Sequence, residues 1–181
     1  MKKITILIVC LILTQATMSQ TYYTRTGLTE FKASVDAFEP VEAKNESTTA
    51  ILKTQSGDIA AQLFINAFKF RVALMQEHFN ENYMESNKYP KAVFRGKLNN
   101  FDFSALSGEQ EFDLVGTLAI RGEKKEIGTK AKVKKEGNQL VLTASFSVQP
   151  QDFNIKIPSI VRKKIADKII ITIDYALVEK K

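Results

Sequence analysis

The stretch LVLTASFSV, residues 140–148, has an apolar side chain at every second position, and the residues between are mostly small and polar. Successive side chains of an extended strand point to opposite faces, so this alternation predicts a β-strand with one face against a core. Residues 112–120, 127–134 and 168–178 repeat the pattern. The sequence therefore favours an all-β fold made of amphipathic strands.

Strands are also predicted on the N-terminal side of this region, where turn-forming residues separate the apolar runs. These further strands cover residues 28–35, 41–53, 59–68 and 91–98. Together the segments suit an eight-stranded antiparallel β-barrel joined mostly by short turns, because closing the sheet removes exposed strand edges. In the last predicted strand the outer face is also partly apolar, and we expect another element to cover it. That face holds Ile170, Thr172, Asp174, Ala176 and Val178.

Two stretches depart from the strand pattern and predict one or two short helices that cap the barrel. The first covers Val72–Tyr83, where apolar residues recur at helical spacing, and it ends before Tyr89-Pro90. The second covers Ser159–Asp167, with Ser159 as the expected N-cap.

The first nineteen residues have the layout of a secretory signal peptide. Lys2 and Lys3 precede an apolar run, Ile4–Leu13, and small residues surround the predicted cleavage site after Ser19. Ten apolar residues are too few to cross about 30 Å of hydrocarbon. We therefore predict a signal peptide over 1–19, a single barrel domain over 20–181, and a periplasmic or secreted location.

The composition of the 181-residue chain excludes several classes of protein. There is one Cys, one His and no Trp, so neither a disulfide scaffold nor a metal site of several His or Cys ligands is available. No common catalytic motif occurs. Two interpretations of His78 remain open: a general base or ligand contact at the barrel mouth, and a surface or packing histidine.

The net charge of +6 does not by itself indicate a nucleic-acid partner. Lysines at positions 130, 132 and 134 alternate with apolar residues, which predicts a solvated outer strand face, and we expect no nucleic acid to bind. Basic residues also gather at 162–164 and at 168. They are expected either to form a solvated helix face or to make transient contact with an acidic membrane surface.

The segment from Glu77 to Phe94, which contains Lys88-Tyr89-Pro90, resembles the YceI-like family, and the resemblance extends over roughly residues 22–178. Thr26–Thr29 stands where the family usually has a His-Ser pair, so no role of that pair is transferred. The resemblance implies a lipocalin-like barrel, usually exported, that holds an isoprenoid chain or a similar amphiphile. It also implies a binding protein that is not an enzyme, with no cofactor other than a bound isoprenoid quinone or polyprenyl lipid.

An eight-stranded barrel is wide enough either to be filled by its own side chains or to hold one small ligand. We therefore predict an exported, non-catalytic carrier with the apolar tail of an amphiphilic lipid in the barrel and the head group near the mouth. The alternatives are a structural or stress-associated envelope protein with a filled barrel and protein partners, and a lipid-acting enzyme using His78. The oligomeric state is open, a homodimer included. The candidate ligand-binding residues are Leu63, Ile65, Met75, Phe79, Tyr83, Phe94, Leu114, Leu118, Leu142, Phe146, Ile171 and Ile173.

Overall fold

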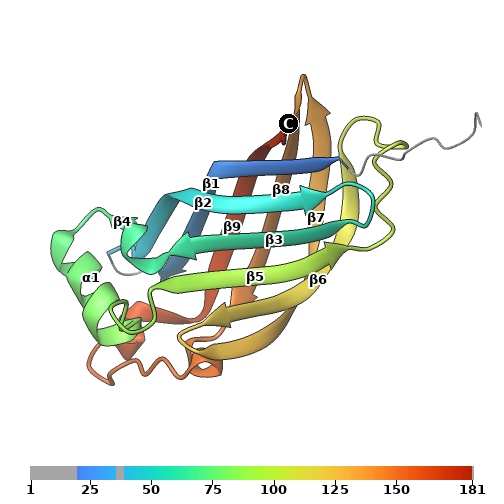
Figure 1. The fold of residues 1–181 in the computed structure, drawn as a ribbon. Helices are drawn as coiled ribbons and strands as arrows, with labels where there is room; N and C mark the ends of the chain where they lie inside the picture. The colour runs from blue at the N-terminus through green and yellow to red at the C-terminus, as the bar shows by residue number, and fades with distance from the viewer. Residues whose placement is uncertain (1–19, 36–38, 181) are drawn as a thin grey trace, which may run out of the picture.

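The computed structural model describes residues 20–35 and 39–180, and the predicted signal peptide lies outside the described residues. Its strands form one antiparallel sheet in the order β1-β9-β8-β7-β6-β5-β3-β2-β4, and β1 also pairs with β2 (Figure 1). This pairing closes the predicted eight-stranded barrel, with the two-residue β4 added at its rim. The strands are β1 (Thr21–Ser34), β2 (Glu42–Lys53), β3 (Asp58–Phe64), β4 (Lys69–Phe70), β5 (Lys91–Leu98), β6 (Gln110–Ile120), β7 (Glu123–Glu136), β8 (Gln139–Val148) and β9 (Ile165–Glu179).

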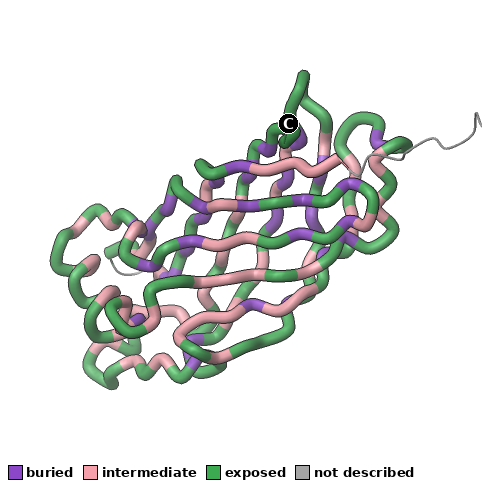
Figure 2. Tube along the Cα trace, in the orientation of Figure 1, coloured by how far each residue is buried: buried purple, intermediate pink, exposed green. Residues whose placement is uncertain are grey.

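The alternation of the sequence places apolar side chains inside the barrel and charged ones outside, and Figure 2 shows burial switching along the strands. The lysines of β7 lie on the outside as predicted. Lys130 forms an ion pair with Asp113 at 2.7 Å, and Lys132 forms one with Glu109 at 3.1 Å. Carboxylates on neighbouring segments therefore neutralise this row of positive charge.

Helical structure occurs at the first of the two predicted positions. Helix α1 (Ala73–His78) continues into a π-helical turn, Phe79–Tyr83. The second predicted helix is wrong: only Arg162–Lys164 forms a 3-10 turn, and β9 begins immediately afterwards at Ile165. Pairing of Ile165 with Ser34 of β1 extends this segment, and no side chain caps the turn. Among the described residues, no helix is both long and apolar enough to cross a membrane.

The expected cover over the outer face of β9 is also wrong. All five residues of that face are exposed, and Ile170 retains 47% of its accessible surface. Isolated apolar side chains on a protein surface are common, so this face does not need a covering element.

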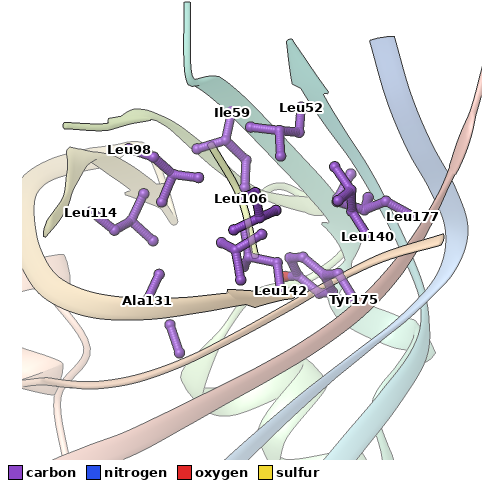
Figure 3. Close-up of a cluster of buried hydrophobic side chains, with 13 residues drawn as sticks. Leu52, Ile59, Leu98, Leu106, Leu114, Ala131, Leu140, Leu142, Tyr175 and Leu177 are labelled. Atoms are coloured by element: carbon purple, nitrogen blue, oxygen red, sulfur yellow. The ribbon is translucent and has the colours of Figure 1, made fainter. Parts of the chain in front are cut away.

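The barrel interior has two parts that differ in how completely they are packed. At the end away from α1, a continuous group of buried side chains fills the barrel (Figure 3), and we call this part the filled half. The loop between β5 and β6 closes that end, because its Leu106 is buried and its Phe101 and Phe103 pack against the group. The buried members are Ala50, Leu52, Ile59, Leu98, Leu106, Leu114, Ala131, Val133, Leu140, Leu142, Ala144, Tyr175 and Leu177.

Candidate ligand-binding cavity

The other part of the interior, which we call the hollow half, contains a cavity of about 410 Å³. Pockets of this size are typical of sites for small apolar ligands. Its far end, the floor, lies against the filled half. Its near end, the mouth, is bounded by α1, the π-helical turn and the connection between β8 and β9, which lie together at one end of the barrel (Figure 1). Because the filled half closes the other end, a ligand has to enter on the side of the mouth.

Eleven of the twelve residues predicted from the sequence line this cavity. Met75, Phe79 and Tyr83 come from the helical segment at the mouth, and the other eight come from the barrel wall. The exception is Leu142, which is fully buried in the filled half. The alternation correctly placed Leu142 inside the barrel, but only the inward residues nearer the α1 end of β8 reach the cavity. Contact of the other eleven with a ligand stays a prediction.

Four phenylalanines hold the helical segment against the barrel at the mouth. The ring of Phe79 stacks on that of Phe31 in β1, with centroids 5.3 Å apart. Phe68 and Phe70 each pack against both of these rings at 5.0 to 5.7 Å. Such aromatic pairs add stabilisation beyond the area that they bury. The cluster therefore positions Met75 and Tyr83 over the cavity.

Arg121, in the turn between β6 and β7, connects the two segments that bound the mouth. Its guanidinium donates to the Glu85 carboxylate, which follows the π-helical turn, and to the backbone oxygen of Asn154. It also lies over the ring of Tyr89, 5.8 Å from the centroid. One mostly buried cation thus holds the segment after α1 and the connection between β8 and β9 in a fixed relation.

Two glycines leave room for the ring of Phe94 on the cavity wall. Gly96 and Gly116 are directly opposite each other on β5 and β6. A Cβ atom added to either glycine would lie 2.7 Å from Phe94 Cζ and even closer to a backbone oxygen. The absence of these side chains lets the aromatic ring lie along the wall, where it covers the glycine pair instead of projecting across the cavity.

Three hydroxyl groups meet at the floor of this mostly apolar cavity. Thr29 Oγ1 hydrogen-bonds Thr48 Oγ1 at 2.8 Å and the phenol oxygen of Tyr175 at 3.1 Å. The three residues belong to β1, β2 and β9, and all are buried. Burial raises the pKa of Tyr175 to about 12, although its hydrogen bond with Thr29 opposes the increase. We call this group the hydroxyl cluster.

A bulge between β1 and β2 brings the hydroxyl cluster together. Asn45 Oδ1 accepts hydrogen bonds from the backbone nitrogen and the hydroxyl of Ser47, at 2.9 and 2.8 Å. The register shifts here, since Gly27 pairs with Thr48 but Thr29 pairs with Asn45. Two consecutive residues of β2 therefore point outward, after which Thr48 points inward.

Gly27 provides the space that Tyr175 occupies. A Cβ atom at this position would lie 2.6 Å from a carbon of the Tyr175 ring. The alternation of apolar residues does not identify Thr29 and Thr48 as site residues, because the bulge interrupts it. The sequence Asn45-Glu46-Ser47 is the available signal, since a short polar side chain that bonds the backbone two residues later marks such an irregularity.

His78 is exposed at the end of α1, although it contributes to the cavity wall near the mouth. Lys164 is the other basic residue of the wall, and it precedes β9. Within residues 20–35 and 39–180, no three His, Cys, Asp or Glu side chains are grouped as a metal site requires. The cavity therefore offers apolar surface along its length, hydroxyl groups at the floor and positive charge at the mouth.

The model of the YceI-like domain matches residues 13–177, nearly the whole chain. The chain belongs to the YceI-like family. Among curated proteins, no sequence matches it. The resemblance noted in the segment containing Lys88-Tyr89-Pro90 thus extends to the complete barrel.

Solved structures with the same fold share little sequence with this chain. A polyisoprenoid binding domain from Saccharophagus degradans, implicated in plant cell wall breakdown, aligns with a TM-score of 0.77 at 11% identity, covering 90% of this chain and 99% of that one. BcnA of Burkholderia cenocepacia aligns with a TM-score of 0.68 at 15% identity, over 83% and 96%. The YCEI protein of Campylobacter jejuni aligns with a TM-score of 0.64 at 16% identity, over 80% and 87%.

Proposed function

We propose that the protein is an exported, non-catalytic binding protein that holds an isoprenoid-like or other amphiphilic lipid in the hollow half of its barrel. The observation that carries this proposal is the 410 Å³ cavity, whose wall is mostly apolar between its two ends. Each Å² of apolar ligand surface removed from water contributes about 25 cal/mol, so a long chain needs few polar contacts. The related domain from Saccharophagus degradans, which binds polyisoprenoids, supports this class of ligand.

The cavity also supports this proposal over its two alternatives, the structural barrel and the enzyme. In a purely structural barrel we expect a filled interior, because an unfilled apolar cavity lowers the free energy of unfolding. The enzyme alternative pairs His78 with a nearby carboxylate, and within the described residues no acidic side chain lines the cavity. An isoprenoid quinone and a polyprenyl lipid are the ligands that we expect first.

Native mass spectrometry of the mature chain, residues 20–181, tests the proposal directly. The protein is purified from an exporting host, and any bound molecule is extracted with solvent and identified. We expect a stoichiometric amphiphile, or its uptake when quinones and polyprenyl lipids are added. Failure of all added lipids to bind would overturn the proposal and favour the structural barrel. Turnover of a lipid that is lost in His78→Ala would instead favour the enzyme.

The same purification tests export and assembly. Cleavage of the predicted signal peptide gives a mature protein that begins at Gln20, found in the periplasm or the medium. An intact mass that includes residues 1–19 would contradict export. Size-exclusion chromatography with light scattering distinguishes a monomer from a homodimer.

We further propose that the mouth makes transient contact with an anionic membrane, from which the ligand is loaded. Residues 154–164, which we call the basic loop, contain four cationic residues and no acidic one. Ile160 in this loop is 87% exposed, and Leu74 on α1 is 56% exposed. Aliphatic side chains beside cationic ones favour the interface of an anionic bilayer, where each Lys or Arg contributes about 1 kcal/mol.

Vesicle flotation tests this contact with charge-matched variants. The pair Lys156→Glu and Lys163→Glu reverses two exposed cations of the basic loop, and the pair Lys53→Glu and Lys97→Glu reverses two on strands at the filled end. We expect the loop variant to lose about tenfold or more of its partition onto vesicles of phosphatidylglycerol and phosphatidylcholine. Equal losses in both variants, or equal binding to phosphatidylcholine alone, would contradict the proposal.

A further inference from the structure

The hydroxyl cluster is the one group of buried hydroxyls among the described residues that line the cavity near the filled half. Thr129 also lines the cavity there, but it is only half-buried and its hydroxyl donates to the backbone oxygen of Ser145. Apolar residues of similar shape would fill the same positions without burying hydroxyl groups. Burial of a hydroxyl costs free energy unless it is hydrogen-bonded, and a hydrogen-bonded pair can often be replaced by apolar groups with little loss. Packing alone therefore gives no reason for three buried hydroxyls at this one level of the barrel.

The cluster retains hydrogen-bonding capacity beyond its internal bonds. Three hydroxyls carry three donor protons and six acceptor lone pairs. The two bonds of the cluster, Thr29 to Thr48 and Thr29 to Tyr175, use two protons and two lone pairs. Even a closed ring of three bonds would leave three lone pairs unused. A ligand group that donates a hydrogen bond therefore finds an unused lone pair in either arrangement, and a group that accepts one finds the third proton when the ring is open.

The charges around the cavity indicate that this group is neutral. Within the described part of the chain, no acidic residue lines the wall, and the two basic residues, His78 and Lys164, belong to the elements at the mouth. A phosphate or carboxylate at the floor would be buried without a counter-charge, which is strongly unfavourable. A hydroxyl or carbonyl group would be buried with a hydrogen-bonding partner.

We propose that the hydroxyl cluster is a subsite for the neutral polar end of the ligand, a hydroxyl or a carbonyl group, which therefore enters the barrel first. The apolar chain then extends from the floor toward the mouth. This orientation is the reverse of the expectation from the sequence, which left the head group near the mouth. The inference rests on the proposed function, because it requires a lipid in the cavity.

The test compares two ligands that differ only at one end, geranylgeraniol and the hydrocarbon that lacks its hydroxyl group. Both are titrated into the mature protein against a fluorescent lipid probe. Tyr175→Phe removes one hydroxyl from the floor, and Tyr83→Phe removes the same group at the mouth, where the opposite orientation would place the polar end. Tyr23→Phe removes a hydroxyl from a tyrosine that does not line the cavity, and it is the control. We expect Tyr175→Phe to weaken binding of the alcohol by about five- to tenfold, while its affinity for the hydrocarbon is unchanged or higher. Tyr23→Phe should leave both affinities unchanged, and Tyr83→Phe should change the affinities for the alcohol and the hydrocarbon in nearly the same proportion.

Each other outcome has a distinct meaning. Equal effects of Tyr175→Phe on both ligands, or a larger effect of Tyr83→Phe on the alcohol, would overturn the floor subsite but leave the lipid-binding function intact. Failure of the unmodified protein to bind either ligand would overturn the floor subsite, and failure of every added quinone and polyprenyl lipid as well would overturn the lipid-binding function. If Tyr175→Phe does not fold, Thr29→Val removes a hydroxyl from the same cluster with little change in shape, and the same ratio decides.

Discussion

In both the filled half and the hollow half of this barrel, the strands point alternate side chains inward. Only in the filled half do these side chains fill the interior. The difference comes from what closes each end. The loop between β5 and β6 inserts Leu106 into the filled half, and its Phe101 packs against Phe112 with ring centroids 5.2 Å apart. At the other end, α1 lies across the opening and leaves the space beneath it free. The connecting segments, more than the strands, therefore determine whether an eight-stranded barrel is filled or hollow.

Leucine-to-alanine substitutions in the two halves should break this comparison most clearly. Leu142→Ala opens a new cavity in the filled half, and we expect it to lower the free energy of unfolding by about 3–4 kcal/mol. Leu118→Ala enlarges a cavity that already exists, so we expect a smaller loss, about 1–2 kcal/mol. Urea denaturation of the unliganded variants measures both. Equal losses would show that the hollow half is as tightly packed as the filled half.

The boundary between the halves should make stability depend on alkaline pH. The pKa of Tyr175 is raised from 10.0 to about 12 in the folded protein. Between these values the unfolded chain loses the phenol proton while the folded chain keeps it, so stability falls as the pH rises from about 10 to 12. The loss is expected to reach about 2–3 kcal/mol. Urea denaturation at several pH values should show this loss of unfolding free energy in the unmodified protein and not in Tyr175→Phe. Parallel profiles for the two proteins would contradict it.

Gly27→Ala should disturb the same boundary by a smaller amount. The added Cβ displaces the ring of Tyr175, and overpacking of this kind is expected to lower the free energy of unfolding by about 1–2 kcal/mol. Gly128→Ala on β7, where an added Cβ meets no atom within 4 Å, is the control. Thermal unfolding of both variants measures the difference. A loss of stability in the control as large as that in Gly27→Ala would rule out contact with Tyr175 as the cause.

Substitutions on the outer surface of the barrel should have little effect on stability, whichever half lies beneath them. Val115 on β6 is exposed, although its neighbour Leu114 is buried at the floor. We expect Val115→Thr to change the free energy of unfolding by no more than about 0.5 kcal/mol. A larger effect, measured by urea denaturation, would mean that the outward face of the strand is covered in solution.

The regular part of the fold could be predicted from the sequence because the physical signal there is local. The prediction for β5, Lys91–Leu98, matches the structure, and that for β8 differs by one residue. β1 begins seven residues before the predicted Leu28, because two consecutive outward residues, Arg25 and Thr26, interrupt the alternation. Residues 159–167 have helical spacing but do not form the predicted helix, because Ile165 pairs with Ser34 of β1 and starts β9.

The residues of the cavity wall were also predictable from local alternation. How far the cavity extends along the barrel was not. Alternation shows which residues point inward, so it placed Phe94, Leu118 and Phe146 on the wall. It carries no information about how far a loop enters the barrel, and so Leu142 was assigned to the cavity. The hydroxyl cluster depends on a bulge and on the approach of Gly27 to Tyr175, which joins distant parts of the chain.

Closure of the barrel between β1 and β9 joins the first strand to the last, with Tyr22 opposite Glu179. Contacts between residues this far apart in the sequence slow folding. Domains dominated by such contacts, β-barrels included, fold in about milliseconds to seconds. Until β9 is synthesised, β1 and β8 both expose unpaired backbone groups along one side, and such edges favour aggregation. Loss of the C-terminal strand would therefore yield an open, self-associating sheet instead of a smaller barrel.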